Sequence, residues 1–207
     1  MSAAPDQPEA PRAALLLAEI ERLKQELTQT RARIADLEAR ADVDPLLDML
    51  NRRGFERELK RSLAYVQRYG TEAALIYLDL DGFKSINDRY GHGAGDNLLK
   101  AVASRLISKV RGSDVVARLG GDEFAVLIWN ASADHALAKA QDLEATVADT
   151  AVIHGAARLS VGASAGIAGL GALDTPAQVI ESADKAMYAR KRARNSNPLP
   201  QGEGGEH

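Results

Sequence analysis

The chain has 207 residues, 45% of them hydrophobic, which suffices for one domain of ordinary size with an additional segment. Its formal net charge of -3 argues against the basic surface that nucleic-acid-binding and membrane-binding proteins usually carry, so we expect neither partner. The absence of cysteine excludes disulfides, thiolate metal sites and thiol nucleophiles, and it favours a reducing compartment, with the cytoplasm as the expected location.

Both ends of the chain are predicted to be disordered. Residues 1–11 are rich in Ala, Pro and acidic residues, and residues 196–207 contain Pro, Gly and Glu without periodicity. The start of the chain also lacks the basic and apolar segments of a signal peptide, and no apolar run approaches the roughly 18 residues of a membrane span. We therefore expect a chain that is neither secreted nor anchored by itself.

Residues 12–43 are predicted to form a coiled-coil helix that joins two chains. No Gly or Pro interrupts Arg12 to Ala41, and apolar residues recur at heptad spacing over about four heptads. The a positions are Ile20, Leu27 and Ile34, and the d positions are Leu16, Leu23, Thr30 and Leu37. β-branched residues at a with Leu at d favour a parallel dimer. The alternative is a helix that packs on its own domain.

From Asp44 to Asn195 the sequence predicts one domain of alternating helices and strands. The expected elements are a helix near 53–69, the strand 73–80, a helix at 95–111, strands at 115–119 and 124–129, a helix near 132–150, a strand near 159–168 and a helix from 176 to about 192. Ser132 is the expected N-cap of one helix, and Thr175 and Gln178 form the expected capping box of the last. This order predicts an α+β fold with a largely antiparallel sheet.

Two pairs of acidic residues stand at the ends of predicted strands. Asp122 and Glu123 follow Gly120-Gly121, a dipeptide expected to supply the positive φ angles of a tight hairpin. Asp79 and Asp81 close the strand 73–80 and point to one face of it. If that strand lies beside the hairpin, Asp79 and Asp122 can share Mg²⁺, which takes one or two carboxylates together with phosphate oxygens. The alternative is ordinary turn chemistry.

These motifs resemble the GGDEF family of diguanylate cyclases, enzymes that join two GTP molecules into cyclic di-GMP. Residues 120–124 spell GGDEF, and residues 79–92, DLDGFKSINDRYGH, with Gly95-Asp96, look like the family's metal-binding and GTP-binding stretch. The resemblance runs from about residue 44 to residue 195. It implies a fold like those of nucleotidyl cyclases and polymerase palm domains.

The resemblance also implies roles for individual residues. Asp79, the main-chain carbonyl of Leu80 and the Asp122 carboxylate would bind two Mg²⁺ ions, for which Mn²⁺ is a substitute. Glu123 would be a further ligand or a helper in proton removal, so Asp122 and Glu123 are the expected catalytic residues. The expected substrate-binding residues are Phe83, Lys84, Asn87, His92, Asp96 and Lys191, with Arg194 one residue early relative to the family pattern.

Within this set, Asn87 and Asp96 would read the guanine edge, because an amide and a carboxylate match its donors and acceptors. Both could instead be helix caps, and Lys191 could be a solvated helix charge.

Two further segments resemble family motifs. Arg111-Gly112-Ser113-Asp114 resembles the R-x-x-D site through which cyclic di-GMP inhibits its own synthesis, and its alternative is a surface ion pair. Residues 44–53 resemble D-x-L-T-G-L-x-N-R-R, except that Leu47 and Asp48 replace Thr and Gly and Met49 conservatively replaces Leu. The sequence therefore predicts a dimeric, product-inhibited diguanylate cyclase. The alternatives are a catalytically silent nucleotide-binding module and a coiled-coil adaptor.

Overall fold

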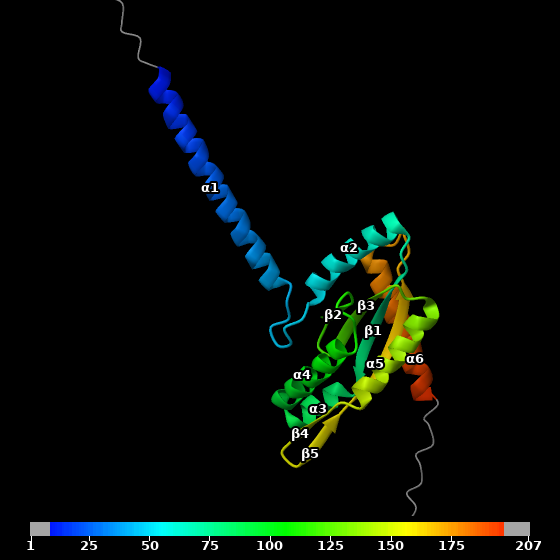
Figure 1. The fold of residues 1–207 in the computed structure, drawn as a ribbon. Helices are drawn as coiled ribbons and strands as arrows, with labels where there is room; N and C mark the ends of the chain where they lie inside the picture. The colour runs from blue at the N-terminus through cyan, green and yellow to red at the C-terminus, as the bar shows by residue number, and fades with distance from the viewer. Residues whose placement is uncertain (1–8, 197–207) are drawn as a thin grey trace, which may run out of the picture. The chain divides into compact units, whose positions relative to one another are not determined.

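The computed structural model describes residues 9–196, with side chains given for 15–31, 33 and 41–193 (Figure 1). Disorder was predicted for residues 1–11 and 196–207: of these, 9–11 and 196 are helical in the structure, and 1–8 and 197–207 lie outside the described residues. The chain divides into two compact units, Met1–Ala41 and Asp42–His207, which are considered separately. Among the helices of residues 9–196, none combines the length and the apolar character needed to cross a membrane.

The described part of the first unit is the helix α1 (Glu9–Ala41), which begins three residues before the predicted Arg12. Its described heptad side chains are exposed: Leu16 by 59%, Ile20 by 47%, Leu23 by 50% and Leu27 by 50%. Exposed ion pairs join Arg22 to Glu19 and to Glu26 on the same helix. The side chains of Ile34 and Leu37 lie outside the described set. The helix itself is confirmed, and its pairing with a second copy stays a prediction.

The second unit is built on a four-stranded antiparallel sheet in the order β2-β3-β1-β6. Its strands are β1 (Ala73–Asp81), β2 (Val115–Arg118), β3 (Glu123–Trp129) and β6 (Gly162–Gly169). A separate hairpin consists of β4 (Ala151–His154) and β5 (Ala157–Ser160), and β4 contacts helix α4. The predicted α+β class with a largely antiparallel sheet is confirmed.

Helices cover both faces of this sheet (Figure 1). On one face lie α2 (Arg52–Tyr69) and α6 (Pro176–Ser196), and on the other lie α3 (Phe83–Tyr90), α4 (His92–Ser108) and α5 (Ala133–Ala148). Strand β1 contributes alternate side chains to the two cores, because successive residues of a strand point in opposite directions. Leu75 and Tyr77 face α2 and α6, whereas Ile76 and Leu78 face α4 and α5.

Two elements, helix α3 and strand β4, were missed by the sequence analysis, and one predicted strand is divided. Helix α3 has only eight residues, and the flanking Gly82 (φ 79°) and Gly91 (φ 81°) take positive φ angles that separate it from its neighbours. The predicted strand near 159–168 is two strands, β5 and β6. The predicted caps are confirmed: Ser132 accepts from the His135 N–H at 3.4 Å, and Gln178 accepts from the Thr175 N–H at 2.9 Å.

Candidate active site

The predicted carboxylates meet where β1 and β3 run side by side. Asp79 is paired in register with Glu123, and the Leu80 N–H donates to the Asp122 carbonyl at 3.0 Å. The condition set by the sequence analysis, that the strand 73–80 lies beside the hairpin, is therefore met. Asp79, Asp122 and Glu123 come together at one end of the sheet.

Electrostatic repulsion characterises this cluster. Burial raises the pKa of the Asp122 carboxyl, and the charges of Asp79 and Glu123 raise it further. Lys191 on α6 opposes this effect, since its ammonium pairs with Asp79 and lies 3.3 Å from Asp81. Burial lowers the pKa of Lys191, but its hydrogen bonds and charge interactions with these two aspartates outweigh burial, so that pKa is raised.

The donor set fits a divalent cation. Two carboxylates, Asp79 and Asp122, lie close enough to repel each other, and an ammonium group already sits against Asp79 as a cation would. No ready-made group of three or more carboxylate or imidazole ligands is found in the part of the chain that the structure describes. Mg²⁺ does not require such a cage, because it keeps waters and takes phosphate oxygens from a bound nucleotide.

The hairpin that carries the signature does not use its glycines as expected. Neither Gly120 nor Gly121 has a positive φ, so the predicted left-handed turn is wrong. Gly120 instead leaves room for the Glu123 side chain, because a Cβ at this position would lie 2.2 Å from Oε2 of Glu123. The Glu123 carboxylate therefore folds back over the turn. Arg118 braces the same turn by donating to the Gly121 carbonyl at 2.7 Å.

The predicted guanine-binding residues come from two adjacent helices, α3 and α4. Asn87 is half-buried within α3, and a Cβ on Gly95 of α4 would lie 1.9 Å from its side-chain oxygen. Asp96 is half-buried one residue later. The N-caps of these helices are Gly82 and Gly91 and their C-caps are Gly91 and Lys109, so neither Asn87 nor Asp96 is the helix cap of the alternative interpretation. Phe83 is buried, while Lys84 and His92 are exposed at the starts of the two helices.

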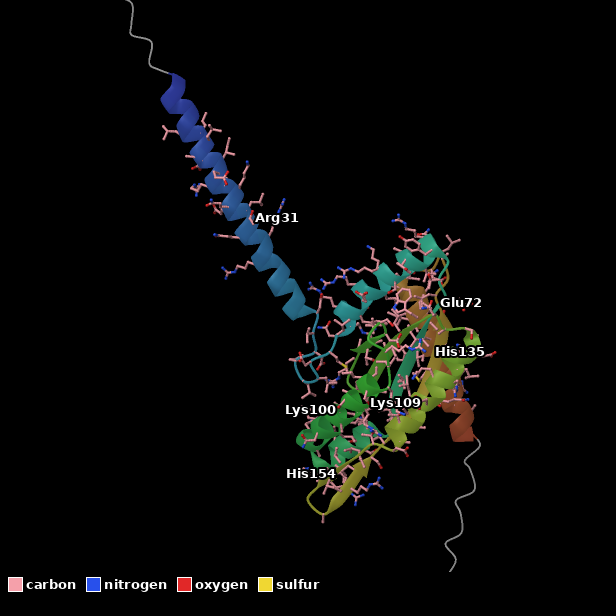
Figure 2. All side chains as sticks on the ribbon, in the orientation of Figure 1. Arg31, Glu72, Lys100, Lys109, His135 and His154 are labelled. Carbon is pink, nitrogen blue, oxygen red and sulfur yellow. The ribbon has the colours of Figure 1, made fainter. Side chains whose placement is uncertain are left out.

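The R-x-x-D segment is a turn that borders a cavity of about 390 Å³. The Asp114 carboxylate accepts from the Arg111 N–H at 2.9 Å and from the Trp129 N–H at 3.3 Å. It is thus engaged by main-chain donors, and the surface ion pair of the alternative interpretation is not what the structure shows. Lys109 and His135, labelled in Figure 2, line the same cavity.

Sequence reasoning missed three residues that contact the carboxylate cluster. Arg52 at the start of α2 and Tyr77 on β1 both reach Glu123, and Ser164 on β6 donates to Asp81 at 3.0 Å. Tyr77 could have been found, because it lies two residues before Asp79 and therefore on the same face of β1. Ser164 could not, since the pairing of β6 with β1 joins residues far apart in the chain.

Comparison with known proteins decides the family. Residues 41–197 match the family model described as diguanylate cyclase, GGDEF domain. The chain belongs to the GGDEF family. Members of this family generally use divalent metal ions, in agreement with the donor set at the ends of β1 and β3.

Individual relatives agree with this assignment. The chain is 40% identical over 184 residues to diguanylate cyclase TpbB of Pseudomonas aeruginosa, covering 86% of this chain and 42% of that protein. It is 39% identical over 168 residues to the probable diguanylate cyclase DgcE of Escherichia coli, covering 81% of this chain and 15% of that protein. The chain thus spans less than half the length of these relatives.

A solved structure covers both units of the chain. The coiled coil and GGDEF domain of DgcB from Caulobacter crescentus, in complex with c-di-GMP, superposes with a TM-score of 0.69 at 30% identity, covering 90% of this chain and 96% of that one.

Proposed function

We propose that this GGDEF protein is a diguanylate cyclase, which condenses two GTP molecules into cyclic di-GMP and releases two pyrophosphates. The observation that carries the proposal is the meeting of Asp79 and Asp122 at one end of β1 and β3, with Lys191 beside them. The relatives named as diguanylate cyclases at about 40% identity support it. The cytoplasm, where GTP is available, is the proposed location.

In the proposed reaction, the 3′-hydroxyl of one GTP attacks the α-phosphorus of a second. A new bond forms between the 3′-oxygen and the α-phosphorus, the bond from that phosphorus to the oxygen that bridges it to the β-phosphate breaks, and pyrophosphate leaves. The same attack in the other direction closes the ring and releases the second pyrophosphate. Asp79, the Leu80 carbonyl and Asp122 would hold two Mg²⁺ ions, which offset phosphate charge and make the hydroxyl more acidic. The single hydroxyl proton would pass to one of the two adjacent carboxylates, Asp122 or Glu123.

The other predicted residues would bind the substrate. Asn87 and Asp96 would bond the guanine edge, and Lys191 would leave Asp79 for the triphosphate once cations occupy the site. Phe83, Lys84 and His92 would border the nucleotide at the starts of α3 and α4. Arg111 and Asp114 would bind cyclic di-GMP as an inhibitor.

Two domains must meet for the reaction, because each site would hold a single GTP. We propose that α1 joins two chains as a parallel coiled coil, which raises the effective concentration of one domain near the other toward about 1 mM.

Replacing Ile20 and Leu27 by Glu would destabilise this coiled coil, since each charge would be buried between the two helices. The specific activity should then fall most at nanomolar enzyme, as it should after removal of residues 1–43. A monomer that matches the full-length rate at nanomolar enzyme would contradict this role of α1.

The direct test is incubation of the full chain with GTP and Mg²⁺, or with Mn²⁺ as the substitute, followed by mass spectrometry of the products. Cyclic di-GMP and pyrophosphate in a ratio of one to two would support the proposal. GTP binding without product would favour the second candidate, a silent nucleotide-binding module. The absence of both would leave the coiled-coil adaptor.

A further inference from the structure

The carboxylate of Glu123 is held from two sides by residues outside the signature. The Arg52 guanidinium lies 3.5 Å from Oε2 of Glu123, and its Nε donates to the Leu119 carbonyl at 2.9 Å. The Tyr77 side chain interacts with both groups, the Glu123 carboxylate and the Arg52 guanidinium. These contacts join helix α2, strand β1 and the signature hairpin at one carboxylate.

Strand geometry explains why Tyr77 reaches Glu123. Tyr77 is paired with Ala125 and Asp79 with Glu123, so Tyr77 and Glu123 are diagonal neighbours on one face of the antiparallel pair. Diagonal neighbours are within reach when one side chain is long or aromatic. Tyr77 is 3% exposed, so its ring is held in the core and its hydroxyl is directed along this face toward Glu123.

Arg52 is itself fixed in place. It is the first residue of α2, and the Asn51 side chain caps that helix by accepting from the Gly54 N–H at 3.0 Å. The planar guanidinium presents donors in a rigid fork, so one group can bond the Leu119 carbonyl and face Glu123 at the same time. Lys would supply the charge without this fork.

We propose that Arg52 and Tyr77 are positioning residues that orient the Glu123 carboxylate toward the metal and nucleotide end of β1. This inference rests on the proposed function of Glu123. Neither residue needs to touch the substrate; both limit the conformations of a side chain that Gly120 leaves free to fold over the turn. Outer contacts of this kind alter metal affinity or activity by about 10–100-fold when removed.

The test measures Mn²⁺ binding by electron paramagnetic resonance, with a GTP analogue whose α–β bridge cannot be cleaved. The variants are Arg52→Gln, Arg52→Lys and Tyr77→Phe in the full chain, each made with Glu123 intact and with Glu123→Gln. Arg61→Gln and Tyr65→Phe are matched controls, because both are exposed residues of α2 away from Glu123. Turnover and melting temperature are measured in parallel.

We expect Arg52→Gln and Tyr77→Phe to weaken Mn²⁺ binding or lower kcat by about tenfold, with a smaller change in KM. In the Glu123→Gln background the same substitutions should change either quantity less than about twofold, since their effect passes through Glu123. Equal losses in both backgrounds, or no loss in either, would overturn the proposal. A wild-type chain that makes no cyclic di-GMP would instead contradict the proposed function, while the Mn²⁺ comparison would still test the positioning.

Discussion

The two ends of the β2–β3 hairpin treat their carboxylates in opposite ways. At the open end, Asp114 accepts hydrogen bonds from two main-chain N–H groups, one of them on Trp129 at the end of β3. At the turn end, Asp122 lies against Asp79 and Glu123, and burial and their charges raise the pKa of its carboxyl. The Asp114 carboxylate thus has hydrogen-bond partners from the main chain, whereas burial and neighbouring charges disfavour the ionised form of Asp122.

This difference indicates what each end can bind. Main-chain donors fix Asp114 in place, and the adjacent Arg111 lines the cavity, which suits an anionic ligand such as a phosphodiester. Repelling carboxylates at the turn end lower their energy by binding a cation, and Lys191 supplies only one positive charge. The hairpin thus separates a proposed inhibitor site from a proposed metal site.

The largest effect that would test this comparison is the loss of catalysis in Asp122→Asn. We expect activity to fall by at least ~100-fold, because a lost metal ligand removes several kcal/mol of transition-state stabilisation. The measurement is initial rate with GTP and Mg²⁺, and Asp184→Asn on the exposed surface of α6 is the charge-matched control. Near-normal turnover by a folded Asp122→Asn protein would contradict the metal assignment.

At the open end, Arg111→Ala should leave the initial rate of cyclic di-GMP synthesis unchanged and abolish inhibition by cyclic di-GMP. A charge-assisted contact contributes about 1.5–3 kcal/mol, so cyclic di-GMP should bind about 10–150-fold more weakly. Calorimetry with cyclic di-GMP and progress curves of turnover measure the two quantities. Arg105→Ala, exposed on the last turn of α4, is the control. Unchanged inhibition would leave Arg111 as a surface cation.

Much of this contrast was accessible from the sequence. The alternation of β1 correctly placed Asp79 and Asp81 on one face, and the apolar runs around Gly120-Gly121 correctly predicted the hairpin. The reason for Gly120 was missed, because the fold of Glu123 over the turn depends on Arg52 and Tyr77, which are distant in the chain. Helix α3 was missed because eight residues between glycines carry too little periodicity to register.

In the metal-free protein, carboxylates at the two ends of the hairpin should affect stability in opposite directions at neutral pH. A raised folded-state pKa makes the ionised Asp122 destabilising above that pKa, and the effect disappears as pH falls below the unfolded value of 3.8. Asp122→Asn should therefore raise the melting temperature at pH 7, by roughly 1–3 °C, and not at pH 3.5. Melting curves in a chelator test this.

The opposite sign is expected beside the cavity at the open end. Although burial opposes ionisation of Asp142, hydrogen bonds and charges from Lys109 and Lys139 hold its pKa below the usual value. That stabilisation is present above the unfolded pKa and is lost as pH falls through the folded value. Asp142→Asn should therefore lower the melting temperature at pH 7 and have no effect at low pH. If Asp122→Asn and Asp142→Asn shift the melting temperature at pH 7 in the same direction, the proposed difference between the two ends of the hairpin is wrong.

The smallest expected effect concerns the turn at residues 44–48, which contacts the β2–β3 hairpin through Arg118. Asp44 accepts from the N–H groups of Leu46 and Leu47 and pairs with Arg118 at 3.1 Å, so another satisfied carboxylate braces the turn end. Asp48 closes this turn at φ 51°, where the family pattern has Gly. The left-handed conformation costs Asp less than most residues, yet more than Gly.

Asp48→Gly should relieve that strain but add conformational entropy to the unfolded chain, worth about 0.4–1 kcal/mol in the opposite direction. The net stabilisation should be roughly 0.5 kcal/mol, or about 1–2 °C in melting temperature. Asp48→Ala keeps the Cβ that is unfavourable at a positive φ angle, and it removes the carboxylate that can offset this cost by local hydrogen bonding. It should therefore destabilise the domain by about 1 kcal/mol. Neither substitution should alter turnover at saturating GTP, because the exposed Asp48 lies outside the carboxylate cluster. If Asp48→Gly melts below Asp48→Ala, the Asp44 turn is not limited by backbone strain.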